Sequence, residues 1–301
     1  MKSVARSTIA GLASPPATIV TIVAAMIGML VALPARAVAE TPRVAFAGVY
    51  GATAGAGRYT AWDRHGSGQP AASGPPGWSA AAAGYAPFGL EDLRVAELSL
   101  ARDAARWGVA ASWRSVSGAA GDPMSRVTGS VYRHLWSGGT VGFGIAGDVG
   151  AEGISTGASL GTIWRPARFV TMGGQLEVGA PSSLISSPVR GGIGLDFGTA
   201  LGGDASWRVA VGRTFDADVA SGLNKGLGTG LDYGLSLHLH ELLGIHAGFA
   251  PGRETASFGL VFGFGGWQGH SALQRHARLG GTSVQGLSWR STAPHRSGRR
   301  P

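Results

Sequence analysis

Between Leu231 and Phe264 apolar residues alternate with small or polar ones, and no other feature of this chain constrains its fold as strongly. In the first run, one parity carries Leu231, Tyr233, Leu235, Leu237 and Leu239, and the other carries Asp232, Gly234, Ser236, His238 and His240. Successive side chains of a β-strand point to opposite faces of the sheet. The alternation therefore predicts a strand with one apolar face and one small, polar face. Two similar runs follow before Phe264.

The same two-faced pattern recurs along most of the chain, interrupted by turn sequences such as Ser137-Gly138-Gly139 and Pro251-Gly252. We expect strands at residues 93–101, 106–114, 126–136, 140–148, 156–164, 169–178, 189–197, 206–214, 230–240, 244–249, 255–264, 267–274 and 282–289. One more strand, at residues 46–50 or 79–85, brings the total to about fourteen, and bacterial outer-membrane barrels have an even number.

The first 37 residues have the features of a signal peptide. Lys2 and Arg6 give a positive start, residues 19–33 form an apolar core, and Ala35-Arg36-Ala37 is a typical cleavage sequence. We expect cleavage near Ala37, with Ala37-Val38-Ala39 as the alternative sequence. An uncleaved membrane anchor is the other interpretation of this segment. After residue 40 no apolar run reaches the roughly 20 residues that a transmembrane helix needs, so we expect no helical span in the mature chain.

Composition excludes several classes of function. The chain has no cysteine, which rules out disulfide frameworks, thiolate nucleophiles and cysteine metal sites. The net charge of +8 comes mostly from the leader and the C-terminal tail, which leaves about +1 for the body. No basic stripe crosses the body, so we expect no nucleic-acid binding. The 52 glycines suit tight turns and a crowded inner surface better than ordinary helices.

We therefore predict an all-β protein, an antiparallel transmembrane β-barrel of about 14 strands with lipid outside and a polar lumen inside. Closure into a ring leaves no unpaired strand edge in the hydrocarbon. The expected organisation is a signal peptide at 1–37, a Gly/Ala/Pro-rich plug or loop segment at 38–77, the barrel at 78–290 and a basic disordered tail at 291–301.

Tryptophans near the ends of the expected strands are the candidates for aromatic girdles at the two membrane interfaces. They are Trp107, Trp113, Trp136, Trp164, Trp207, Trp267 and Trp289. The alternative is that these rings close the ends of a soluble core.

The polar parity of the last long strands supplies the candidate lumen-facing residues. They are Asp232, Ser236, His238, His240 and His246. Histidines at this spacing on adjoining strands can bind a metal ion. Polar side chains that fill a wet lumen explain the same residues without a metal, and we adopt that interpretation. No nucleophile elbow or phosphate-loop context accompanies them, so we expect no catalytic residue, no cofactor, no metal site and no enzyme activity.

Two segments carry a family resemblance. Residues 85–94 read Tyr-Ala-Pro-Phe-Gly-Leu-Glu-Asp-Leu-Arg, and a second stretch runs from Gly230-Leu231-Asp232-Tyr233 to Leu279-Gly280-Gly281-Thr282. The first resembles the entry into the first long strands, and the second resembles the closing strands, of outer-membrane barrels of the FadL type and the PorV/PorQ type. That family often carries an Asp-Tyr pair in its penultimate strand, where this chain has Trp267-Gln268.

The resemblance implies a protein of the cell outer membrane that passively transports small hydrophobic molecules. The PorV-type features imply a second interpretation, a non-transporting scaffold or secretion-associated barrel. A soluble periplasmic β-protein is the third. The partners expected for an outer-membrane barrel are outer-membrane lipid and the barrel assembly machinery, with small hydrophobic ligands added for a transporter.

Overall fold

The computed structural model describes residues 56–61, 65, 68–90, 93–118, 121–150, 153–179, 189–202, 205–217, 231–240 and 242–291. All of them belong to one compact unit, Ala35–Pro301. The expected signal peptide, its cleavage near Ala37 and the alternative strand at 46–50 lie outside the described residues. No helix among the described residues has the length and apolar character needed to cross a bilayer.

Fourteen strands and two short 3-10 helices make up the regular structure of the described residues. In chain order they are β1 Gly77–Ala86, η1 Pro87–Gly89, β2 Leu93–Asp103, β3 Trp107–Gly118, β4 Gly121–Trp136, β5 Gly139–Gly150, β6 Gly153–Ala167, β7 Val170–Gly179, β8 Val189–Gly202, β9 Ala205–Ala217, β10 Leu231–His240, β11 Leu243–Ala250, η2 Pro251–Arg253, β12 Thr255–Phe264, β13 Trp267–His276 and β14 Gly280–Arg290.

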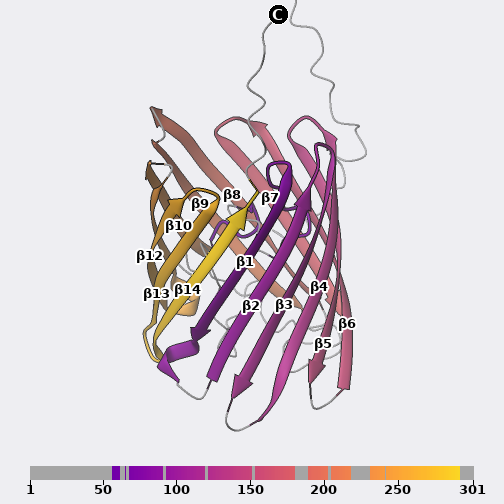
Figure 1. The fold of residues 1–301 in the computed structure, drawn as a ribbon, viewed down its shortest axis with the longest axis vertical. Coiled ribbons are helices and arrows are strands. Elements are labelled where there is room, and N and C mark those ends of the chain that lie inside the picture. Colours follow the sequence, from indigo (N-terminus) through magenta and orange to yellow (C-terminus); the bar gives the residue numbers. More distant parts are fainter. Residues whose placement is uncertain are drawn as a thin grey trace, which may run out of the picture. The chain divides into compact units, whose positions relative to one another are not determined.

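Each strand pairs with its sequence neighbours in antiparallel fashion, and β1 pairs with β14 to close the ring. Figure 1 shows this closure, with indigo β1 beside yellow β14. The prediction of an antiparallel barrel of about fourteen strands is therefore confirmed. The first strand is β1, which corresponds to the expected strand at 79–85. Most observed strands extend beyond the expected ranges by one to several residues, because ladder pairing continues past the point where the apolar alternation fades.

The two faces of the barrel wall differ in chemistry, as the alternation in β10 illustrates. Leu231, Tyr233 and Leu235 are exposed on the outside, whereas Asp232 and Ser236 are buried on the inside. The same division holds around the ring, where large apolar side chains dominate the exposed set. A soluble monomer rarely exposes so much contiguous apolar surface. A closed wall with an apolar exterior is the arrangement that a lipid bilayer requires.

The two rims of the barrel differ in the length of their connections. At the rim that holds the start of β1 and the end of β14, six connections of two or three residues join the strands. At the other rim the connections run from two residues to the thirteen between β9 and β10. We call these ends the short-turn rim and the long-loop rim. Tight turns at the former place Gly138 and Gly265 at positive φ, which only glycine adopts without strain.

Candidate functional site

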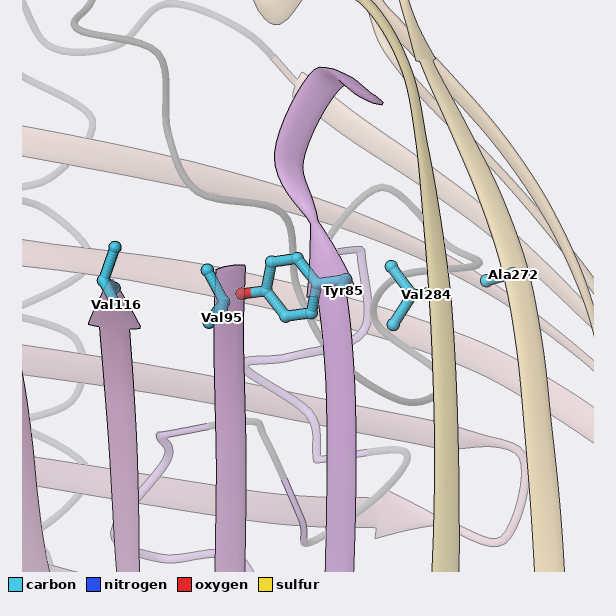
Figure 2. Close-up of a cluster of buried hydrophobic side chains, with 5 residues drawn as sticks. All are labelled: Tyr85, Val95, Val116, Ala272 and Val284. Atoms are coloured by element: carbon cyan, nitrogen blue, oxygen red, sulfur yellow. The ribbon is translucent and has the colours of Figure 1, made fainter. Parts of the chain in front are cut away.

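One arc of the inner wall carries a continuous apolar cluster. Five buried residues on adjacent strands form it: Tyr85, Val95, Val116, Ala272 and Val284. We call this cluster the apolar arc. Figure 2 shows its members side by side, with the Tyr85 ring lying along the wall toward Val95. All five belong to the inward parity of β13, β14, β1, β2 and β3 and lie near the long-loop rim. They form a continuous apolar strip, whereas other buried apolar residues of the barrel strands, such as Ile163 and Val261, lie outside this cluster.

The polar end of Tyr85 lies within the wall. Its hydroxyl lies close to Glu97 on β2. Glu97 in turn forms an ion pair with Arg114 on β3. The aromatic ring of Tyr85 therefore adds apolar surface to the arc, while its polar end lies beside an ion pair of the wall.

A second arc of the inner wall is built from glycine. Gly142, Gly161, Gly173 and Gly192 lie on the inward parity of the consecutive strands β5, β6, β7 and β8. We call these four residues the glycine arc. A Cβ atom at Gly142 would overlap the backbone of Pro70, and one at Gly173 would overlap the Tyr59 carbonyl. A Cβ at Gly192 would overlap the Tyr59 ring and one at Gly161 the Gln69 amide. The missing side chains let the segment before β1 lie directly against the wall.

Hydrogen bonds join this segment to the same side of the barrel. The Tyr59 hydroxyl donates to Thr214 Oγ1 on β9 at 3.0 Å. The Gln69 side-chain amide donates to the carbonyl oxygen of Gly174 on β7 at 3.0 Å. Gln175, also on β7, donates to the carbonyl oxygen of Gly68 at 2.7 Å. Each bond pairs a polar group of the segment with the wall.

The same segment also contacts the opposite side of the ring. His65 Nδ1 lies 2.7 Å from Ser99 Oγ on β2. The Gly74 amide donates to Asp103 Oδ1 on β2 at 3.1 Å, and Asp103 accepts a second hydrogen bond from the Tyr132 hydroxyl. Because β2 and β9 stand seven strands apart in a ring of fourteen, they face each other across the lumen. The described part of residues 56–76 thus contacts opposite walls from within the barrel.

The expected plug or loop segment spans residues 38–77, and its first part, 38–55, lies outside the described residues. The contacts above concern only residues 56–61, 65 and 68–76 of it. The expected tail also lies outside the described residues apart from Ser291, whose hydroxyl donates to the Trp78 carbonyl.

A charged cluster lies on the inner face toward the long-loop rim. Arg126 on β4 forms ion pairs with Asp148 on β5 and Glu177 on β7. The second bond passes over β6, whose inward residues there are small, including Ser155 and Gly157. One guanidinium thus links three of four consecutive strands and compensates two inward carboxylates.

The predicted lumen-facing residues separate into two groups. Asp232, Ser236 and His246 are buried on the inner face, and His246 is only 1% exposed. His238 and His246 lie side by side with ring centroids 5.5 Å apart. A β-bulge between His238 and His240 breaks their shared register, so His240 lies exposed at the strand end, where its Nδ1 accepts a hydrogen bond from the Leu242 amide.

Within the described residues, no three potential ligands are placed to hold a metal ion.

The tryptophans gather at one rim. Trp107, Trp136, Trp164, Trp207, Trp267 and Trp289 all lie at or near strand ends on the short-turn rim, whereas Trp113 lies within β3. Trp78, which the sequence analysis did not single out, starts β1 at the same rim and is 46% exposed. The structure thus places seven of the described tryptophans at one rim and Trp113 within a strand, and the two girdles remain a prediction.

Sequence reasoning missed both arcs of the inner wall. The apolar arc was hidden because its members occupy the inward parity, on which most residues are polar or small. The glycine arc had a visible signal in Gly142, Gly161, Gly173 and Gly192, which share the inward parity of four consecutive strands. Without the ring order and register, nothing indicated which chain segment these glycines would meet.

No family model and no curated protein matches this chain. Among solved structures, the toluene transporter TbuX of Ralstonia pickettii aligns over 82% of this chain and 99% of its own, with a TM-score of 0.57 and 10% identity. The KdgM porin also matches, over 71% of this chain and 99% of its own, with a TM-score of 0.43 and 10% identity. Omp33 of Acinetobacter baumannii matches over 72% of this chain and 98% of its own, with a TM-score of 0.48 and 8% identity. The likeness to TbuX is one of fold. With the apolar exterior, it identifies an outer-membrane β-barrel, as the sequence predicts.

Proposed function

We propose that this protein passively transports small hydrophobic molecules across the outer membrane. The observation that carries the proposal is the apolar arc, a continuous strip of five buried apolar residues on adjacent strands of the inner wall. The members of the arc are only 1–7% exposed, so a solute reaches them only when the atoms that cover them move. An apolar solute then gains free energy from contact with the strip, whereas a sugar or an ion does not. TbuX, which shares the fold, is a toluene transporter, so a barrel of this kind can carry a small apolar molecule.

The test compares solutes in liposomes that contain the purified protein. A small aromatic hydrocarbon is expected to cross faster than a sugar of similar size. The double variant Val95→Thr/Val284→Thr keeps side-chain shape but adds hydroxyls to the apolar arc, so it should slow the hydrocarbon and leave the sugar unchanged. The matched control, Val131→Thr/Val209→Thr, makes the same changes on the exposed outer face and should leave selectivity unaltered.

A non-transporting scaffold is the second candidate, and the contacts of residues 56–76 favour it. Hydrogen bonds to β2, β7 and β9 hold this segment inside the ring, as a permanently closed barrel would require. Absence of flux for both solutes, from protein shown to be folded by heat-modifiable gel mobility, would remove the transport proposal and support the scaffold.

A further inference from the structure

Tryptophan and arginine alternate across four adjacent strands on the outer face of the short-turn rim. Trp78 on β1 stands directly opposite Arg102 on β2, with the Arg102 guanidinium 5.5 Å from the centre of the Trp78 ring. Trp107 on β3 stands directly opposite Arg133 on β4. All four side chains are exposed. We call these four residues the Trp-Arg row.

Register joins the two pairs into one row. Arg102 is paired with Val109 on β3, and Trp107 lies two residues from Val109 on the same outward parity. Arg102 and Trp107 are therefore diagonal neighbours, which in an antiparallel pair places Cα atoms about 7–8 Å apart. The order across β1 to β4 is thus Trp, Arg, Trp, Arg.

The arginines of the row have no carboxylate partner among the described residues. The nearby acidic residue, Asp103, belongs to the opposite parity of β2 and points inward, where it accepts hydrogen bonds from Gly74 and Tyr132. Arg106, in the turn between β2 and β3, is also exposed and adds a third positive charge. This part of the rim is therefore a positive surface at the edge of the apolar wall.

We propose that the Trp-Arg row binds the headgroup of an anionic phospholipid in the periplasmic leaflet. Guanidinium groups form paired hydrogen bonds with phosphate oxygens, and tryptophan rings favour the headgroup level of a bilayer. The short-turn rim is the periplasmic one because outer-membrane barrels carry short turns on that side and longer loops outside. The proposal rests on the outer-membrane fold and is independent of what the lumen transports.

Native mass spectrometry of the full chain, released from bilayers with equal phosphatidylglycerol and phosphatidylcholine, tests the proposal. The wild type should retain an excess of phosphatidylglycerol, and Arg102→Gln/Arg133→Gln should lose it. The matched control is Arg94→Gln/Arg275→Gln, which removes two exposed outward arginines at the long-loop rim and should keep the excess. Solute flux should be the same in all three proteins.

Two results would overturn the proposal: no phosphatidylglycerol excess in the wild type, or equal loss of the excess in the test and control variants. Heat-modifiable gel mobility checks folding. If the glutamine variant does not fold, Arg102→Lys/Arg133→Lys replaces it, because lysine keeps the charge but cannot form the paired hydrogen bonds. A reduced excess in the lysine variant supports the proposal, and an unchanged excess contradicts it.

Discussion

The apolar arc and the glycine arc occupy different parts of one inner wall, yet their outer faces are alike. Behind the apolar arc lie exposed residues such as Leu98 and Leu100, and behind the glycine arc lie Phe143 and Ile145. The two arcs differ only in which residues contact them from inside the barrel. In the glycine arc the backbone of Tyr59 and Pro70 reaches the wall, so a Cβ atom has no room. The lipid sets the outer residues of every strand, whereas the inner residues depend on what the lumen contains.

The largest loss of stability is expected from arginine substitutions on the outer face. This loss should be the same on the strands of the apolar arc and on those of the glycine arc. Ile145→Arg on β5 and Leu98→Arg on β2 each place a guanidinium in hydrocarbon near the middle of a strand. Each should lower the free energy of unfolding by about 2–4 kcal/mol. Urea titration of the protein in liposomes, followed by tryptophan fluorescence, measures both.

A different loss of unfolding free energy in the two variants would contradict the inference that both arcs have the same lipid-facing exterior. If one of the two arginines were tolerated, that side of the barrel would face a partner or water and not lipid. Arg133, already exposed on the outer face at the rim, provides the reference for a cation that a bilayer edge accommodates.

The next largest effect is expected from adding a side chain to an inward glycine of β5, compared with an outward glycine of the same strand. Gly142→Val places a side chain where the Pro70 backbone lies, while Gly147 on the outward parity of the same strand has no atom within 4 Å of an added Cβ. Overpacking should cost Gly142→Val about 1–3 kcal/mol. The displaced segment should also raise solute flux in liposomes. Gly147→Val should change neither property, and an equal rise in flux for both variants would contradict docking on the glycine arc.

The repeated parts of this fold could be predicted from sequence because each strand carries its own signal. Alternation such as that of Leu235 and Ser236 reports burial locally, and Gly-containing turns report where strands end. These two signals predict about fourteen strands, with the first strand left open between residues 46–50 and 79–85. The β-bulge at His238 and His240 was missed, since a one-residue change of register leaves the alternation of types intact.

The candidate site could be predicted only in part. Inward parity identified Asp232, Ser236 and His246, because parity is a local property. The contacts of Tyr59 with β9 and of His65 with β2 join residues far apart in sequence, and no local pattern encodes them. The apolar arc likewise arises only when β13 and β14 close against β1.

A smaller effect tests the hydrogen bonds that hold the segment on the glycine arc. Gln69→Ala removes the donor to the Gly174 and Tyr59 carbonyl oxygens. The expected cost is about 0.5–1.5 kcal/mol, with faster protease cleavage near residue 69. Gln285→Ala is the matched control, because that amide donates to Ser271 and Ser283 on the exposed outer face and holds no part of the segment. Faster cleavage in Gln285→Ala as well would assign the effect to the barrel as a whole.

The smallest effect is expected outside both arcs, at the long-loop rim. Glu254 and Arg278 form an ion pair at 3.0 Å with both side chains largely exposed. Water and salt screen such a pair, so Glu254→Gln should change the free energy of unfolding by only about 0–1 kcal/mol, less at high ionic strength. The same substitution at Glu177, whose carboxylate pairs with Arg126 on the inner wall, should cost more and depend less on salt, because the Arg126 side chain is 17% exposed. Equal costs and equal salt dependence at the two sites would mean that water screens the inner wall as fully as the rim.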